Sequence, residues 1–188
     1  VDRSDRFAAV NVQRSACRIR NIERVEDKRT GRTADDVKRR VATGEVEQAH
    51  IADDQLFVAF PKDDPRDPPA TISADEIDAM SAGGRLLLLE DGHCLKDHAL
   101  AACNRPELRG SATMIGTSLH TLVQLVDNGL GLTMIPEMAV DAGILQGTDV
   151  VARPLETDNA AREIALIWRK NSPRRSDFEL LAEELRAG

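Results

Sequence analysis

Two of the three cysteines, Cys94 and Cys103, stand nine residues apart in the stretch EDGHCLKDHALAAC, residues 90–103. Cys94 follows a Gly-His pair and opens a short helical pattern, with His93 and Lys96 close in sequence. Backbone N–H groups at a helix N-terminus favour a thiolate. A thiolate reacts with a peroxide to give a sulfenic acid, which condenses with a second thiol to a disulfide. The pattern therefore makes Cys94 the candidate reactive thiol and Cys103 its candidate resolving partner.

The spacing of the two cysteines couples any disulfide between them to a change of backbone. If residues 95–102 form a helix, positions 94 and 103 are about 13.5 Å apart along its axis. A disulfide requires Cα atoms within about 7 Å of each other, so this helix would have to unwind. Closing a ring of about ten residues is worth roughly 2.7 kcal/mol, which is comparable to the packing of a short helix. Such a bond would act as a conformational switch.

The same residues allow two other interpretations. From spacing alone, two unrelated small core residues are the simpler explanation of Cys94 and Cys103. A zinc site could draw on Cys94 and His98, which are four residues apart, with His93 and Cys103 adjacent. No second Cys-x-x-Cys or His pair completes a tetrahedral set, so we expect no metal and no cofactor. Cys17, in an unusual N-terminal segment, is expected to be incidental.

Alternating strand and helix patterns surround the cysteine segment. Apolar β-forming runs predict strands at 54–60, 85–91, 130–135 and 162–170. Helical patterns are predicted at 71–80, 95–102, 119–128 and 172–187. This alternation predicts a mostly parallel α/β sheet, whose ligand crevices lie beyond the carboxyl ends of the strands. Phosphate-loop and Gly-x-Ser-x-Gly motifs are absent from the sequence, so nucleotide binding and serine hydrolase chemistry are unsupported.

Local signals mark the ends and faces of the predicted helices. Ser73 with Glu76 three residues later has capping-box spacing, and Asn128-Gly129 is typical of a helix C-terminus. Trp168 is expected in the core. We expect the last helix to be amphipathic, with one apolar face made of Phe178, Leu181 and Leu185.

The composition bounds the class of protein. A chain of 188 residues, 41% of them hydrophobic, suits one moderate domain or two small lobes. The net charge of −7 argues against nucleic acid lying across most of the surface. Apolar runs such as Leu86 to Leu89 are too short for a membrane helix, and we expect no membrane partner. An odd number of cysteines without a dense framework indicates reduced thiols, so we expect a cytoplasmic protein.

Residues 1–52 differ in character from the remainder. No leucine precedes Leu56, and residues 1–50 carry 12 Lys or Arg and 9 Asp or Glu, against 13 and 23 in residues 51–188. A charge-rich segment with few large apolar residues cannot easily offset the entropy of ordering. We expect an atypical segment over 1–52, either disordered, an isolated helix or translated out of frame, and a folded domain over 53–188. A basic arm for nucleic acid is less favoured because acidic residues interleave the basic ones.

Three stretches resemble a known family: LLLLEDGHCLKDHALAAC at 86–103, GTSLHTLVQLVDNGLGLTMIPEMAV at 116–140 and IALIWRKNSPRRSDFELLAEEL at 164–185. They are similar to the regulatory domains of the OxyR family, the hydrogen-peroxide sensors among the LysR-type transcriptional regulators. The resemblance runs from about residue 53 to the end. The Gly-His-Cys-Leu-x-Asp stretch with its second cysteine is specific to that family, whereas the Thr-Ser-Leu helix and Gly-x-x-x-x-Pro strand occur widely in LysR-type domains. The resemblance favours the thiol switch over the two alternatives.

This resemblance implies a periplasmic-binding-protein-like α/β domain of two lobes, the LysR substrate-binding fold. We expect 60–150 to form a complete lobe and 160–188 to be part of the second lobe. The first half of that second lobe, and a winged helix-turn-helix domain with a linker helix, precede this region in the family. We therefore expect the chain to be N-terminally incomplete relative to the family.

The resemblance also implies roles for individual residues. Cys94 would be the peroxidatic cysteine and Cys103 the resolving one. The residues around the reactive thiol would be His93, Lys96 and Asp97, and those lining the pocket at a helix start would be Thr117 and Ser118. Lys96 stands where the family has arginine, which keeps the charge and loses the bidentate fork. On sequence grounds alone, caps of turns and helices explain these polar residues equally well.

The implied function is a regulatory module and not an enzyme. Peroxide would oxidise Cys94, a reversible Cys94–Cys103 disulfide would remodel the segment, and a changed dimer interface would alter how attached DNA-binding domains grip a promoter. The implied partners are hydrogen peroxide, further copies in a dimer or tetramer, and a thiol reductant such as glutaredoxin. DNA and RNA polymerase would be reached only through the intact full-length protein. A LysR-type domain that binds a small-molecule effector with passive cysteines is the main rival, and a thiol peroxidase is a weaker one.

Overall fold

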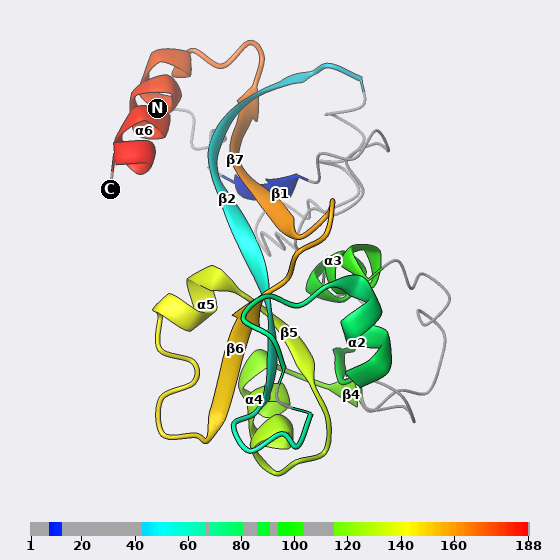
Figure 1. The fold of residues 1–188 in the computed structure, drawn as a ribbon. Coiled ribbons are helices and arrows are strands. Elements are labelled where there is room, and N and C mark those ends of the chain that lie inside the picture. The colour runs from blue at the N-terminus through cyan, green and yellow to red at the C-terminus, as the bar shows by residue number, and fades with distance from the viewer. Residues whose placement is uncertain are drawn as a thin grey trace. The chain divides into compact units, whose positions relative to one another are not determined.

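The computed structural model describes residues 8–12, 43–66, 68–80, 86–90, 94–103 and 115–187. The chain divides into two compact units, unit one with residues 1–53 and 162–188 and unit two with residues 54–161 (Figure 1). The chain passes from one unit to the other within strand β2 (Val46–Pro61) and at the start of strand β7 (Ala161–Arg169). The predicted site residues all lie within the range of unit two.

Unit two is built around the carboxyl-terminal half of β2. Strands β5 (Thr133–Pro136) and β6 (Val150–Pro154) both pair with β2 in antiparallel register. Strands β3 (Leu88–Leu89) and β4 (Ile115–Gly116) pair in parallel, and a parallel bridge joins Leu86 to Leu132 just before β5. The strands are therefore mixed in direction, and the prediction of a mostly parallel sheet is wrong. Strands β3 and β5 are predicted in the correct order, whereas β4 is not predicted from the sequence, and β2 runs antiparallel to β5 and β6.

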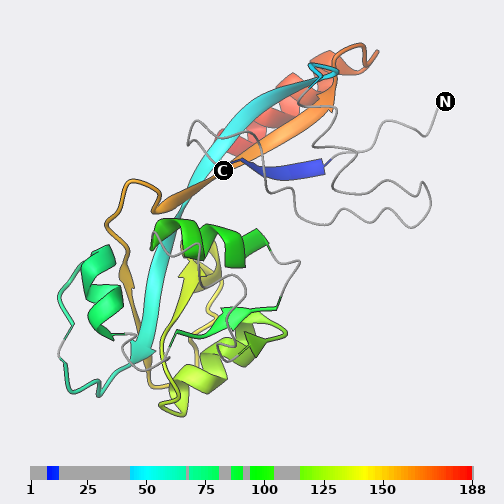
Figure 2. The same cartoon turned by 90° about the vertical axis from the view of Figure 1, so that its right-hand side faces the viewer.

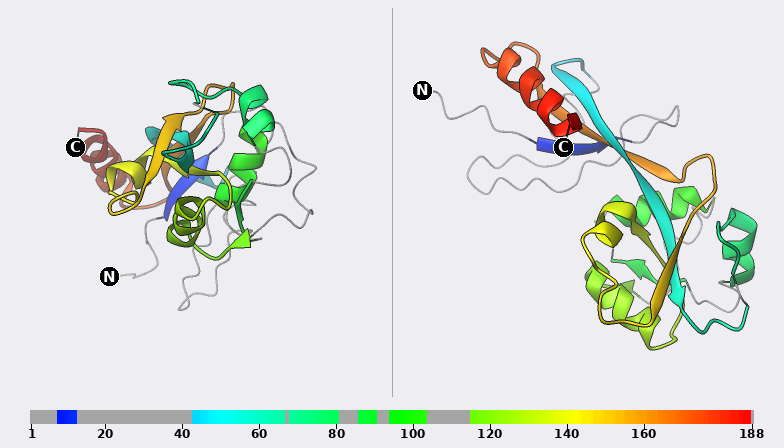
Figure 3. Two further views of the ribbon diagram at one scale, coloured as in Figure 1. Left: turned by 60° about the horizontal axis from the view of Figure 1, so that its bottom comes forward. Right: turned by 60° about the vertical axis from the view of Figure 1, so that its left-hand side comes forward.

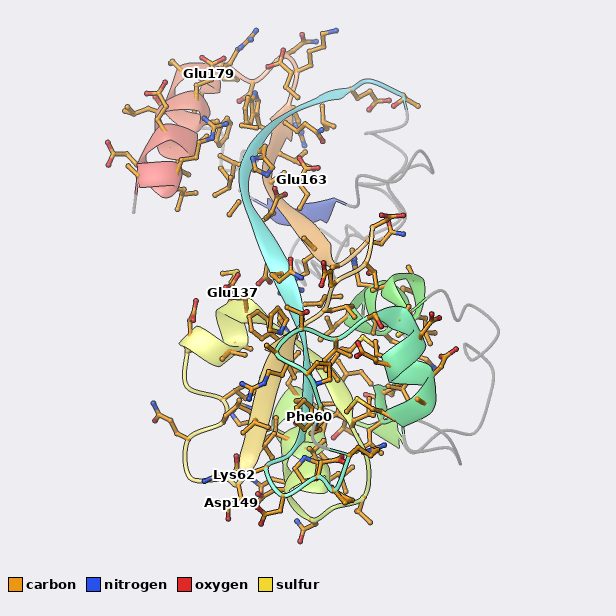
Figure 4. All side chains as sticks on the ribbon, viewed as in Figure 1. Phe60, Lys62, Glu137, Asp149, Glu163 and Glu179 are labelled. Carbon is orange, nitrogen blue, oxygen red and sulfur yellow. The ribbon has the colours of Figure 1, made fainter. Side chains whose placement is uncertain are left out.

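Four described helices accompany these strands: α2 (Ala74–Met80), α3 (Cys94–Ala102), α4 (Leu119–Asp127) and α5 (Glu137–Asp141). Helix α5 lies on the opposite side of β2 from α2 (Figures 1 and 3). Helix α3 contacts β3, and α4 contacts β3, β4, β5 and β6. Phe60 of β2, labelled in Figure 4, is 2% exposed within this core. The core is rich in fully buried aliphatic side chains, among them Leu56, Ile77, Leu87, Leu100, Leu122, Leu132 and Ile135.

The predicted helix ends are confirmed. The Ser73 N–H donates to the Glu76 carboxylate at 2.6 Å, and the Glu76 N–H donates to Ser73 Oγ at 3.3 Å, which is a reciprocal capping box. These hydrogen bonds lower the pKa of Glu76. Helix α4 ends at Asp127 with Asn128 as its C-cap, and Gly129 takes a positive φ of 71°, the left-handed conformation that glycine adopts without strain.

Unit one contains β1 (Ala8–Val12), the amino-terminal half of β2, β7 and helix α6 (Arg175–Ala187). Strand β7 lies between β1 and β2, and α6 lies along β2 and β7 (Figure 2). Trp168 is 7% exposed and its ring stacks on that of Phe178 with centroids 5.8 Å apart, so the prediction that Trp168 is a core residue is confirmed. Leu185 is 51% exposed, and its predicted place on the buried face is wrong. The buried residues of α6 are Phe178 and Ala182, and Leu181 packs partly buried against the same cluster.

The N-terminal segment is described only in part. Of residues 1–52, the structure describes 8–12 and 43–52, which include β1 and the beginning of β2. The remainder of the expected atypical segment, with Cys17, lies outside the described residues. Among the described helices, none is long and apolar enough to cross a bilayer.

Candidate functional site

The predicted site residues follow the carboxyl ends of two neighbouring strands. Strand β3 ends at Leu89 and the chain continues to α3, whose first residue is Cys94. Strand β4 ends at Gly116 and is followed by Thr117 and Ser118 at the start of α4. The strands are parallel, and the Glu90 N–H donates to the Gly116 carbonyl at 3.1 Å. The amino ends of both helices therefore meet at one edge of the strands, where α/β folds place their ligands.

Cys94 occupies the position that the sequence predicts. It is the first residue of α3, and the predicted helix over 95–102 is confirmed. The free N–H groups of the first turn give this end of a helix a partial positive charge, which favours a thiolate. Asp97 lies half-buried in the first turn of α3, where a carboxylate is stabilised by the same charge. His93 and the side chain of Cys94 lie outside the described residues.

Cys103 lies directly after the other end of α3. Its N–H donates to the Ala99 carbonyl at 3.1 Å, so the helical hydrogen-bond pattern continues to the cysteine. Cys103 is in no disulfide and is only 3% exposed. Its thiol donates to the Ala99 carbonyl at 2.9 Å and lies 3.7 Å from Met134 Sδ. With α3 continuous, positions 94 and 103 are separated by about 13.5 Å of helix rise, too far for a disulfide.

Lys96 is buried to an unusual degree for its type. It is 5% exposed, and it lines a small crevice with residues 87–89, Thr133 and Met134. Its aliphatic stem packs along the leucines of β3, as long cationic side chains do on apolar surfaces. Lys96 belongs to the first turn of α3, two residues after Cys94.

Thr117 and Ser118 are differently placed. Ser118 is the N-cap of α4: its Oγ accepts the Thr121 N–H at 3.2 Å and shares a 3.0 Å hydrogen bond with Thr121 Oγ1. The N-cap interpretation of Ser118 is therefore confirmed. Thr117 is exposed at the edge that follows β4. Its role at this edge stays a prediction.

Sequence analysis did not single out Met134. This residue is 2% exposed on β5, contacts the Cys103 thiol and lines the crevice that contains Lys96. The apolar run of residues 130–135 indicates a buried strand but not which side chain faces α3. Within the described part of the chain, no group of three or more His, Cys, Asp or Glu side chains could hold a metal ion.

Residues 37–188 match the LysR substrate binding domain family. The chain belongs to this family. The match begins at residue 37, inside the segment 1–52 whose composition differs from that of the remaining chain. The solved structures that resemble the chain confirm the predicted periplasmic-binding-protein-like fold. The reduced regulatory domain of OxyR2 from Vibrio vulnificus is 34% identical to this chain with a TM-score of 0.64. The match covers 76% of this chain and 65% of that one. The reduced regulatory domain of OxyR from Pseudomonas aeruginosa is 27% identical with a TM-score of 0.63, covering 82% and 80%.

The curated relatives are transcriptional regulators. The regulator EstR of Acinetobacter baylyi is 36% identical over 139 residues, which are 73% of this chain and 44% of EstR. OxyR of Escherichia coli K12, described as a DNA-binding transcriptional dual regulator, is 41% identical over 106 residues, which are 56% of this chain and 34% of OxyR. The chain therefore spans less than half the length of these relatives. It is a LysR-type regulatory domain with OxyR-like homologues.

Proposed function

We propose that this regulatory domain senses hydrogen peroxide through a reversible disulfide between Cys94 and Cys103. The observation that carries the proposal is the placement of the two cysteines at opposite ends of one continuous helix, with Cys103 reduced and buried. A helix that separates the thiols in the reduced state makes their bond incompatible with that state. Oxidation would then be read out as a change of backbone.

The chemistry has two balanced steps. The Cys94 thiolate attacks one oxygen of hydrogen peroxide, giving a sulfenic acid and hydroxide, which takes up a proton to become water. Cys103 then loses its proton and attacks the sulfenic sulfur, which forms the disulfide and releases a second water. The α3 N-terminus and Lys96 favour the thiolate of Cys94 in the first step.

The polar residues around Cys94 have proposed supporting roles. We assign His93 and Asp97 the orientation and protonation of the reacting groups at the start of α3, which are the Cys94 sulfur and the peroxide. Thr117 and Ser118 follow the neighbouring strand at the same edge, and we assign Thr117 the more direct contact with peroxide because it is an exposed residue, whereas the Ser118 hydroxyl caps α4. Ser118 acts through its capping of α4.

The biological setting is part of the proposal. In a longer regulator, the domain would form a dimer or tetramer and transmit its redox state to DNA-binding domains, and through them to RNA polymerase. A thiol reductant of the glutaredoxin type would reset the disulfide. Such a cycle requires the reducing environment of the cytoplasm.

Peptide mapping by mass spectrometry after one equivalent of hydrogen peroxide tests the proposal. We expect a loss of about two mass units that maps to a Cys94–Cys103 bond and is reversed by dithiothreitol. Cys103→Ser should instead accumulate a sulfenic acid that dimedone traps at Cys94. Cys17→Ser is the matched control and should form the bond as the parent does. Two free thiols at positions 94 and 103 after treatment would refute the proposal.

An effector-binding domain with passive cysteines is the second candidate. One observation favours it: the match to EstR covers 73% of this chain, whereas the match to the Escherichia coli OxyR covers 56%. In that case peroxide leaves Cys94 and Cys103 unmodified, and a small organic molecule raises the melting temperature of the domain. The two candidates therefore give opposite results in the same peroxide experiment.

A further inference from the structure

Two sulfur atoms meet in the core of unit two. Cys103 Sγ lies 3.7 Å from Met134 Sδ, and the two residues are 3% and 2% exposed. The Cys103 thiol also donates to the Ala99 carbonyl at 2.9 Å. A thiol has one proton to donate, and both of these neighbours are acceptors. They stabilise the protonated thiol and repel the electron pair of a thiolate.

We propose that Met134 is a positioning residue that keeps reduced Cys103 protonated, buried and unreactive until the end of α3 opens. The biological meaning of this role rests on the proposed function, because the attack of Cys103 on a Cys94 sulfenic acid requires the Cys103 proton to leave. The thiolate is the reactive form of cysteine, and here it would form beside a thioether and a carbonyl oxygen. The departure of the Cys103 thiol from this environment then limits the rate of disulfide formation.

Met134 is distinguished from its neighbours on β5. Thr133, the preceding residue of β5, also borders the crevice that contains Lys96, but it donates its hydroxyl to the Leu87 carbonyl at 2.9 Å. Met134 also lines the crevice that contains Lys96. One flexible thioether therefore borders α3 near both of its ends, and methionine adapts its shape to such a position.

Alkylation of Cys103 tests this role directly. A chain that carries Cys17→Ser and Cys94→Ser retains Cys103 as its only thiol. In this background, Met134→Leu keeps the side chain apolar and removes the sulfur. We expect iodoacetamide to alkylate Cys103 about fivefold faster, the factor that corresponds to one lost hydrogen bond. The pH of half-maximal rate should also fall, because an acceptor beside the thiolate has been removed.

Two variants separate this role from a loss of packing. Met138→Leu makes the same chemical change at a residue that is 58% exposed, and it should leave the rate unchanged. Ile135→Val removes a buried methylene on the same strand, lowers stability by a comparable amount and should leave the pH profile unchanged. If Met134→Leu folds poorly, norleucine at position 134 provides the unbranched analogue without sulfur.

The outcomes distinguish this inference from the proposed function. Equal alkylation rates and pH profiles in the Met134 parent and the Met134→Leu chain would overturn the role of Met134, whatever peroxide does. A chain with both cysteines that forms no disulfide refutes the proposed function and leaves the alkylation result standing. Where both hold, Met134→Leu should close the Cys94–Cys103 bond about fivefold faster after the sulfenic acid has formed.

Discussion

Weakening α3 should make the Cys94–Cys103 disulfide easier to form. Ala101 is a half-buried residue in the last turn of α3, and the hydrogen bond from the Cys103 N–H to the Ala99 carbonyl spans it. Ala101→Gly disfavours the helix by about 0.5–1 kcal/mol relative to alanine. The substitution acts on the reduced state, because only that state requires residues 94–103 to be helical. In the oxidised state this segment is unwound, and the greater backbone freedom of glycine does not disfavour it.

The expected shift follows from the two-electron relation between free energy and potential. About 30 mV corresponds to 1.4 kcal/mol, so a loss of 0.5–1 kcal/mol in the reduced state lowers the midpoint potential by roughly 10–20 mV. Destabilising the reduced form disfavours reduction, and the sign is therefore negative. Equilibration in dithiothreitol redox buffers, followed by acid quenching and mass spectrometry, measures the fraction of disulfide.

Ala139→Gly is the matched control. Ala139 is also half-buried in a short helix of unit two, but α5 does not lie between the cysteines. It should lower the urea midpoint as Ala101→Gly does and leave the redox potential unchanged. An unchanged or more positive potential for Ala101→Gly would refute the argument that the helix opposes the disulfide.

Three further substitutions test the packing that supports the site. Asp54 is 2% exposed and accepts the Met138 N–H at 3.0 Å, so Asp54→Ala should lower the free energy of unfolding by about 1–3 kcal/mol in urea titrations. Glu76 has its pKa lowered by the Ser73 N–H, so it stabilises the fold above its unfolded pKa and loses this effect as pH falls below about 4.3. The melting temperatures of the parent and Glu76→Gln should therefore converge between pH 7 and pH 3. A Cβ at Gly116 would lie 2.6 Å from a leucine of α4, so Gly116→Ala should lower unfolding stability in urea by about 1–3 kcal/mol.

Each of these substitutions has an informative opposite result. Asp53→Ala changes an exposed carboxylate beside Asp54 and should cost less than about 0.5 kcal/mol, so equal losses at the two positions would contradict the capping of α5. A constant difference in melting temperature across the pH range would contradict the assigned role of Glu76. An unchanged urea midpoint for Gly116→Ala would show that α4 can move away from β4 without cost.

Local structure around the site could be predicted from sequence because its signals are short-range. The capping box of Ser73 and Glu76, the glycine after α4 and the helix between the cysteines each depend on residues within a few positions of one another. The edge that follows β3 and β4 is different, because β4 is not predicted from the sequence and its pairing with β3 is a long-range contact.

Long-range partners could not be predicted in this way. The antiparallel course of β2 depends on how the chain enters unit two, and no residue of β2 specifies its direction. Cys103 and Met134 are in contact although they are 31 residues apart in the sequence. Met134 belongs to β5, a strand in which every residue is buried, so burial alone does not single it out. Leu185 fits a helical apolar face by spacing, but spacing does not tell where along the helix the contact with the strands ends.

The energetics of α3 connect its chemistry with the core. A helix of nine residues is shorter than the roughly 12–15 that an isolated helix needs, so tertiary packing must hold it. Leu100 and Cys103, at 0% and 3% exposure, provide part of that packing. A disulfide that unwinds α3 would withdraw both from the core, and closing a ring of about ten residues costs roughly 2.7 kcal/mol of further chain entropy. The oxidation itself, together with repacking of the β3 leucines and Met134, would have to offset both losses. A redox change at one sulfur would therefore extend into the central strands of unit two, which is the property a regulatory domain requires.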